Sequence, residues 1–278
     1  MPTTTTYALR AAVLALLATL IGGCATTTGS DGTADASAAA EAPETEGMQD
    51  PIEGFNRGVF AFNETLDDYA LEPAANAWIA VTPEPARNSV GNFFDNLAAP
   101  GQVLNNALQG KGQAAATDGA RFFVNSTIGL AGLFDVATGV GLETRPEDFG
   151  QTLGVWGVDS GAYLMLPLLG PSSARDVTRY PVSWYTDVLS YVSVDTVARV
   201  GLLGINIVNT RAQLGRALSI RDEAALDPYA FTRSSYEQQR RNQIYDGDPP
   251  AGEDDPYGDF FDQNGGGDEG PPAPPPEE

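Results

Sequence analysis

The chain has 278 residues, a formal net charge of −22 and no histidine. The absence of histidine excludes Ser-His-Asp catalytic triads and histidine-based zinc sites. The acidic balance argues against a nucleic-acid interface, which needs a basic face. Cys24 is the single cysteine, so a disulfide within the chain is excluded.

The first residues have the pattern of a bacterial lipoprotein signal. Arg10 precedes an apolar run over 11–21, which is too short to span a bilayer as a helix. Small residues then lead to Cys24, so we expect a signal peptide over 1–23 and an acylated Cys24. Ala25 after the cysteine favours the outer membrane. The alternative is an ordinary secretory signal that ends near a cysteine.

Both ends of the remaining chain are acidic and poor in apolar residues. Residues 24–49 read as an acylated cysteine followed by a disordered tether. Residues 246–278 are rich in Asp, Glu, Pro and Gly, and read as a disordered acidic tail. The composition favours a solvated tail, and the alternative is a contact for a basic partner or for divalent cations. The span 50–245 is left as one folded domain.

The clearest helix is expected over 54–69, where Phe55, Val59, Phe62, Leu66 and Tyr69 form one apolar stripe. Proline at position 73 follows it. Asn56 and Asn63 are seven residues apart and therefore share a face of this helix. They lie either at the surface or in contact with neighbouring backbone through their side-chain amides.

Further helices are expected after a break at Thr82–Pro85. One runs to Pro100, a short one covers 103–108, and another covers 113–125. Toward the C-terminus, 192–208 reads as a buried or partly membrane-inserted helix. Helices at 222–226 and 229–241 complete the domain.

The stretch from Phe149 to Asp176 combines frequent glycines with many apolar residues. Such a segment must be ordered against an apolar surface. A pair of short strands is possible around 150–163, and Ser172 or Ser173 is expected to cap a helix. Arg175, in the first turn of that helix, reads more readily as a surface ion pair than as a ligand for a carboxylate or phosphate.

These patterns predict an all-α fold with at most one small β-hairpin. The helices are short, broadly apolar and often interrupted by Gly or Pro. That combination favours a ring or disc of amphipathic helices facing lipid on one side over a four-helix bundle.

Several motifs resemble, in order, those of the MlaA (VacJ) lipoprotein family. They are Asp50 to Arg57 (Asp-Pro-Ile-Glu-Gly-Phe-Asn-Arg), Phe62 and Asn63, Pro85 to Asn88, Arg121 to Gly129, Asp148 to Gly154, Tyr163 to Pro167, Arg175 and Asp176, Arg211, Asp227 to Tyr229, and Tyr236. The resemblance covers about residues 50–245. The long tether and the acidic tail depart from the family pattern.

The resemblance implies a helical ring in the periplasmic side of the outer membrane, with a central amphipathic channel. It implies removal of mislocalised phospholipids from the outer leaflet and their transfer to a periplasmic lipid carrier of the Mla pathway, next to a trimeric porin. It implies no enzyme activity, no cofactor and no metal. The alternatives are an adaptor lipoprotein that organises porins without moving lipid, and a lipid hydrolase, which the missing histidine and thiol chemistry weighs against.

With this resemblance, the segment 149–176 is expected to border the channel. The candidate lipid-path residues are Phe149, Gly150, Leu153, Gly154, Gly161, Tyr163, Leu166, Pro167, Gly170 and Arg175. The motif residues with expected structural roles are Gly54, Phe55, Asn56, Arg57, Phe62 and Asn63.

Overall fold

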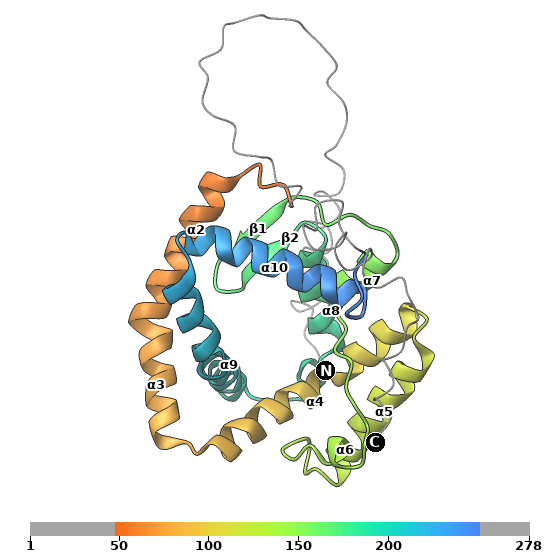
Figure 1. Ribbon diagram of the computed structural model, residues 1–278. Coiled ribbons are helices and arrows are strands. Elements are labelled where there is room, and N and C mark those ends of the chain that lie inside the picture. The colour runs from red at the N-terminus through yellow and green to blue at the C-terminus, as the bar shows by residue number, and fades with distance from the viewer. Residues whose placement is uncertain (1–47, 251–278) are drawn as a thin grey trace, which may run out of the picture. The chain divides into compact units, whose positions relative to one another are not determined.

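The computed structural model describes residues 48–250. The predicted signal peptide, Cys24, and nearly all of the tether and tail lie outside the described residues. Within 48–250 the chain is helical apart from one two-stranded antiparallel hairpin (Figure 1), so the predicted fold class is confirmed. The elements are α2 (Glu53–Leu66), the π-helix η1 (Asp67–Leu71), α3 (Glu72–Val81), α4 (Glu84–Leu108), α5 (Gly112–Thr127), α6 (Val136–Gly139), α7 (Phe149–Val155), β1 (Tyr163–Leu166), β2 (Gly170–Ser173), the 3-10 helix η2 (Asp176–Thr178), α8 (Arg179–Thr186), the 3-10 helix η3 (Val188–Ser190), α9 (Thr196–Ala224) and α10 (Pro228–Ile244).

The first predicted helix does not end before Pro73. It passes through η1 into α3, and Pro73 lies in the first turn of α3. A proline ring clashes with the carbonyl group four residues earlier, here that of Tyr69. Tyr69 lies inside the π-helical turn, whose wider winding moves that carbonyl group away. The π-helix therefore lets one continuous helical path contain a proline.

The helices predicted on either side of Pro100 are one helix, α4, with Pro100 in its interior. An interior proline costs a backbone hydrogen bond and about 3 kcal/mol in helix propensity. Contacts of α4 with α5, α7, α8 and α9 surround it and override that cost. The helix predicted over 113–125 is confirmed as α5.

Two helices predicted near the C-terminus, at 192–208 and 222–226, are also one helix, α9. The Asp195 carboxylate accepts a hydrogen bond from the amide of Val197 at 3.0 Å and caps its start. The last predicted helix is confirmed as α10. Asp227 caps it by accepting bonds from the amides of Tyr229 and Ala230, and Pro228 occupies the first turn.

The contacts between neighbouring elements form a closed circuit that begins and ends at α2. α2 contacts β1, β2 contacts α10, α10 contacts α9, and α9 contacts α3, which continues from α2 through η1 (Figure 1). α4 contacts α9 and also α5, α7 and α8. The hairpin and α7 therefore connect helices that lie far apart in the sequence.

The interior of the described part of the chain is unusually polar. Its buried hydrophobic cluster consists of Met48, Tyr163, Met165, Tyr229 and Tyr236. Polar side chains are buried in greater number, among them Asn56, Asn96, Asn105, Asn106, Asp118, Asn125, Gln151, Thr152, Asp176, Asn209 and Arg240. Soluble domains show the opposite preference.

Large apolar side chains, in contrast, are widely exposed among residues 48–250. Val197 is 79% exposed, Phe123 68% and Phe55 64%. Apolar surface of this extent needs a cover other than water. Within the same residues, no helix combines the length and the apolar character needed to cross a bilayer.

Candidate functional site

The predicted strand pair at 150–163 is wrong in position. Residues 149–155 form α7, and the Asp148 carboxylate accepts a hydrogen bond from the Gln151 amide at 2.9 Å to start that helix. The hairpin lies further along, with β1 paired to β2. Leu168 and Gly170 have left-handed φ angles of 67° and 77° in the connecting turn, a conformation that favours glycine.

Ser172 and Ser173 do not cap a helix as predicted, because both lie in β2 and are buried. The Ser173 hydroxyl accepts a hydrogen bond from the Asp176 amide at 3.0 Å and shapes the exit from the strand. The helix that follows is the short 3-10 turn η2, continued by α8.

Strand β1 is bound to α2 by two side-chain amides. Asn56 donates to the carbonyl of Tyr163 at 3.0 Å and accepts from the amide of Met165 at 2.9 Å. Asn63 donates to the carbonyl of Leu166 at 3.0 Å and accepts from the amide of Leu168 at 2.9 Å. We call these two contacts the amide clamp. Of the two alternatives left open by the sequence, the structure shows the second, in which Asn56 and Asn63 tie the helix to neighbouring backbone.

The spacing of the amide clamp follows from helix and strand geometry. Seven residues along a helix rise about 10.5 Å, and three residues along a strand rise about 10 Å. Asn56 binds at 163 and 165, and Asn63 binds at 166 and 168, three residues further along the hairpin. The two amides thus stand where a neighbouring strand would otherwise pair with this edge.

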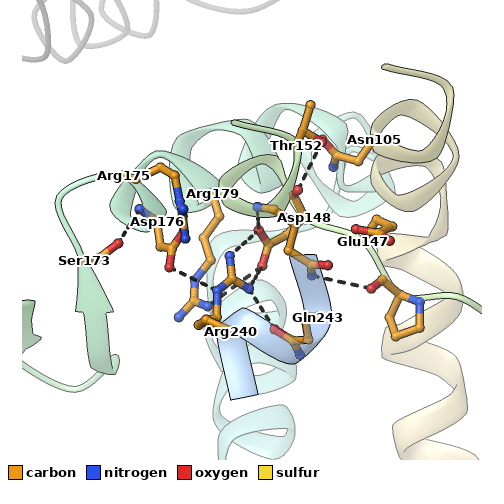
Figure 2. A network of polar contacts seen from close by, with 12 residues as sticks. Asn105, Glu147, Asp148, Thr152, Ser173, Arg175, Asp176, Arg179, Arg240 and Gln243 are labelled. Atoms are coloured by element: carbon orange, nitrogen blue, oxygen red, sulfur yellow. Dashed lines mark hydrogen bonds and ion pairs between the residues drawn. The ribbon is translucent and has the colours of Figure 1, made fainter. Parts of the chain in front are cut away.

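The two ends of the segment 149–176 are held by charged groups, which we call the carboxylate network (Figure 2). Asp176 is fully buried and accepts bonds from Arg175 at 2.8 Å, Arg240 at 3.0 Å and the Tyr236 hydroxyl at 2.6 Å. The guanidinium of Arg240 also donates to both oxygens of Asp148, at 2.7 and 3.0 Å. The network joins α7, η2 and α10.

Burial and hydrogen bonding act in opposite directions on these carboxylates. Burial alone would raise the pKa of Asp176, but the bonds from Arg175 and Arg240 hold that pKa well below its usual range. The pKa of Asp148 is lowered in the same way, because its bonds to Arg240 outweigh its burial. Both groups are therefore ionised near neutral pH, and the network is paired and structural.

Arg175 belongs to this network, so its predicted role as a surface ion pair is wrong. Its side chain is only 6% exposed and binds Asp176. Its guanidinium also donates to the carbonyl of Val158 at 3.2 Å. A surface pair was the expected outcome because the sequence gives no sign that the chain folds over this residue.

Two of the predicted glycines are required by close packing in the network. A Cβ atom on Gly150 would lie 2.5 Å from a carboxylate oxygen of Asp176 and 2.8 Å from the guanidinium of Arg240. A Cβ atom on Gly154 would lie 2.7 Å from the side chain of Ile244. Both glycines let α7 approach η2 and α10 closely.

An apolar groove of about 560 Å³ lies beside the hairpin turn. It is lined by Gly54, Phe55, Gly58, Val59, Phe62 and Pro167. Phe55 and Phe62 are 64% and 53% exposed, and next to Pro167 the turn residues Leu168 and Leu169 are exposed as well. The groove brings together residues predicted separately as family motif (Gly54, Phe55, Phe62) and lipid path (Pro167).

The remaining predicted lipid-path residues lie in different surroundings. Tyr163 is fully buried, with its ring edge-on to Tyr229 and Tyr236. Phe149 packs edge-on against Trp156, and Leu153 and Leu166 are half-buried. Gly161 has a left-handed φ of 67° and lies against Ala174. The structure therefore brings only Pro167 of this group to the groove.

Arg57, the remaining motif residue, lies at the surface. It donates to Glu53 at 2.6 Å and to Asp227 at 2.7 Å, and its guanidinium lies 4.4 Å above the ring of Tyr229. It connects the first turn of α2 to the start of α10. Exposed ion pairs of this kind contribute little to stability.

Among the described residues, one group of carboxylates is close enough to hold a metal ion: Asp67, Asp68 and Glu72, whose oxygens lie within 4.8 Å of one another. Arg211 already donates three hydrogen bonds to Asp67, at 2.6, 2.7 and 2.9 Å. This arginine supplies the positive charge that an ion would bring.

Sequence reasoning missed Tyr236 and Arg240 as partners of Asp176, and Asp148 as the second partner of Arg240. Arg240 is 64 residues from Asp176. A local pattern assigns it to the last turn of a helix, where a base suits the dipole. One signal was available in the sequence. Several positions of the family motifs are charged although the domain has few basic residues, which suggests that these charges pair with one another.

Comparison with known proteins gives consistent matches. The family model described as MlaA lipoprotein matches residues 48–243. The chain is 37% identical over 242 residues to the intermembrane phospholipid transport system lipoprotein MlaA of Shigella flexneri, covering 83% of this chain and 87% of the relative. It is 36% identical over 235 residues to the protein of that name from Escherichia coli K12, with the same coverage.

A solved structure matches as well. It is described as "Structural basis for maintenance of bacterial outer membrane lipid asymmetry", and the match has a TM-score of 0.63 at 36% identity. The match covers 70% of this chain and 99% of the solved chain. The similarity therefore extends over the whole solved chain.

Proposed function

The chain belongs to the MlaA lipoprotein family, and from this premise we propose that it is the outer-membrane lipoprotein of an intermembrane phospholipid transport system. It takes mislocalised phospholipids from the outer leaflet and passes them to a periplasmic lipid carrier, which maintains lipid asymmetry. It acts without covalent chemistry, because moving a lipid along a graded surface requires binding alone.

The observation that carries this proposal is the inverted polarity of the described residues. Asparagine, aspartate and arginine side chains are buried between elements, while Phe55, Phe123 and Val197 are exposed. Hydrocarbon around the outside would cover the apolar side chains, and internal hydrogen bonds satisfy most of the buried polar ones. The inversion supports a protein that sits within one leaflet of the outer membrane, on its periplasmic side.

The lipid path in this proposal is an amphipathic channel bordered by the segment 149–176. The closed circuit of contacts among the helices and the hairpin supports an enclosed passage. At the hairpin turn, the apolar groove with Phe55, Phe62 and Pro167 offers a surface for acyl chains. The amide clamp holds the middle of the segment and the carboxylate network holds its two ends, so the passage keeps its width.

The partners in this proposal are phospholipid, the outer membrane, a periplasmic lipid carrier of the Mla pathway and a trimeric porin beside the chain. Acylation at Cys24 would supply a stable anchor, since two acyl chains or more hold a protein on a membrane. The alternative is an adaptor that organises porins and transports no lipid.

Transfer of labelled phospholipid tests the proposal. The purified chain is reconstituted in vesicles, and delivery to a soluble lipid carrier is measured with and without it. Gly58→Leu fills the groove, because nothing lies within 4 Å of a Cβ atom there, and we expect it to slow transfer severalfold. Gly119→Leu, at an equally open helical glycine outside the groove, is the matched control.

An adaptor gives a different result in the same assay. It would leave transfer at the vesicle background and would not copurify with phospholipid. In cells that lack the protein, phospholipid in the outer leaflet should rise, and the intact chain should restore the normal amount. Restoration without any measurable transfer would favour the adaptor.

A further inference from the structure

The loop between α5 and α6, residues 128–134, is built in an unusual way, and we call it the apolar loop. Ile128, Leu130 and Phe134 are 67%, 61% and 55% exposed. Phe123, just before it, and Val140, just after it, are exposed as well. A loop in water is normally polar at these positions.

The backbone of the apolar loop is strained in order to adopt this shape. Leu130, Ala131 and Gly132 have consecutive left-handed φ angles of 53°, 59° and 90°. Residues other than glycine rarely adopt this conformation, and a branched side chain such as leucine makes it costly. Such strain persists only where the surroundings hold the backbone in place.

The strained shape satisfies the loop's own backbone. Every amide from 128 to 134 except that of Leu130 donates a hydrogen bond to a carbonyl group within 124–130. These include Gly132 to Asn125 at 2.8 Å and Phe134 to Gly129 at 3.0 Å. A loop in water has no need of this, because water serves its amides. In hydrocarbon, each amide without a partner costs several kcal/mol.

The polar side chains around the loop are also satisfied from within. Asp135 is the only charged residue between Arg121 and Glu143, and it binds the Arg121 guanidinium through both oxygens at 3.1 Å. Asn125 donates to Asp135 at 3.0 Å, and the Thr127 hydroxyl donates to the carbonyl of Phe123 at 2.7 Å. The loop therefore presents no free charge.

The frame behind the loop leaves it little freedom. A Cβ atom on Gly129 would lie 2.2 Å from the carbonyl oxygen of Phe134, and one on Gly132 would lie 2.4 Å from the side chain of Asn96. Asn96 itself donates to the Ser126 hydroxyl at 2.9 Å. The apolar side chains are thus held outward on a rigid support.

From these observations we propose that the apolar loop inserts into the hydrocarbon of a lipid bilayer and fixes the depth at which the protein sits. The inference rests on the proposed function in taking a membrane as its setting. A surface that binds a protein partner typically contains Tyr, Trp or Arg residues that contribute most of the binding energy. A protein partner could also offer hydrogen bonds to the loop. The loop has none of those residues, and all of its amides except that of Leu130 are bonded internally, which matches acyl chains.

Depth-dependent quenching tests the insertion. A fluorophore is attached at Leu130→Cys in the full chain, and labelling at Cys24 is measured in the parent and subtracted. The protein is placed in phosphatidylethanolamine and phosphatidylglycerol vesicles with nitroxide on the acyl chain or on the head group. We expect acyl-chain nitroxide to quench this label at least threefold more than a label at Leu226→Cys, which lies at a fully exposed position far along the chain.

A second variant separates insertion from folding. Asparagine tolerates left-handed backbone better than leucine, so Leu130→Asn should keep or raise the thermal midpoint in detergent. In a Cys24→Ser background, which removes the expected acyl anchor, the pair Ile128→Asn and Leu130→Asn should reduce vesicle binding at least tenfold. Leu226→Asn is the control and should leave binding unchanged.

Two results would overturn the inference: equal quenching at positions 130 and 226, or unchanged vesicle binding by the asparagine pair. A lowered midpoint for Leu130→Asn would indicate that the leucine serves the fold instead. Lipid transfer is measured on the same vesicles. Normal transfer with an unquenched loop rejects the insertion alone, and a quenched loop without transfer rejects the proposed function alone.

Discussion

The segment 149–176 is held by different chemistry in its middle and at its two ends. At the hairpin, Asn56 and Asn63 bind backbone through neutral amides. At the junction with α10, Asp148, Asp176 and Arg240 bind one another as ions. Removing one partner of a buried neutral hydrogen bond costs about 1–3 kcal/mol, whereas leaving a buried ion alone costs about 3–5 kcal/mol. Loss of an amide contact should therefore destabilise the segment less than loss of an ionic contact.

Arg240→Met should give the largest effect. It leaves Asp176 and Asp148 with much of their charge unpaired, Asp176 at a fully buried position, so we expect the free energy of unfolding to fall by about 3–5 kcal/mol at pH 7. Chemical denaturation in detergent measures it. Arg241→Met, at the exposed neighbour, should change stability by less than about 0.5 kcal/mol. Equal losses of stability in the two variants would show that these ion pairs do not hold the ends of the segment.

Asn56→Ala should have the next largest effect. It leaves the amide of Met165 and the carbonyl of Tyr163 without partners in a buried site, at a cost of about 2–3 kcal/mol. Asn63→Ala, at the less buried end of the amide clamp, should cost about 1 kcal/mol. The same denaturation measurement ranks them, and a larger loss at Asn63 would reverse the assignment of the main contact.

Gly150→Ala tests how closely the charged end is packed. The added methyl group meets Asp176 and Arg240, so the network must shift, at a cost of about 1–2 kcal/mol. Gly119→Ala has open space at a helical position and should stabilise the protein slightly. Thermal midpoints distinguish a loss from a gain. Stabilisation by both substitutions would mean that α7 can move away without cost.

The pH dependence should give the smallest effect, and only in acid. The pKa values of Asp148 and Asp176 are lowered in the folded state, so their contribution to stability is present above about pH 4 and is lost as the pH falls through those values. The stability gap between the parent and Arg240→Met should therefore narrow below about pH 4. The gap for Asn63→Ala should stay constant, since neither this amide nor its backbone partners titrate; a gap that follows pH there would contradict the comparison.

Local patterns were enough to predict α2, α5 and α10. Their apolar spacing, prolines and capping residues act within a few positions, and the seven-residue spacing of Asn56 and Asn63 showed that both face one way. The continuity of α4 through Pro100 could not be predicted this way. It depends on contacts with four other helices, which override the local cost of proline.

The sequence was enough to predict which segment forms the candidate site, but not how its residues are arranged in space. Frequent glycines and apolar residues indicated that 149–176 is ordered. The position of the hairpin was missed because Asp148 caps a helix where the glycines suggested strands. The burial of Arg175 depends on Tyr236 and Arg240, which reach Asp176 only after the chain has folded back. No local sequence pattern predicts such a contact between distant parts of the chain.

The buried asparagines and ion pairs have a consequence for calorimetry. Exposure of apolar groups to water raises the heat capacity on unfolding, and exposure of polar groups lowers it. Because the interior of this protein is largely polar, the heat capacity change in a micelle should be small for a domain of its size. Its stability curve should then be shallow, and its resistance to denaturation should vary little between cold and warm conditions.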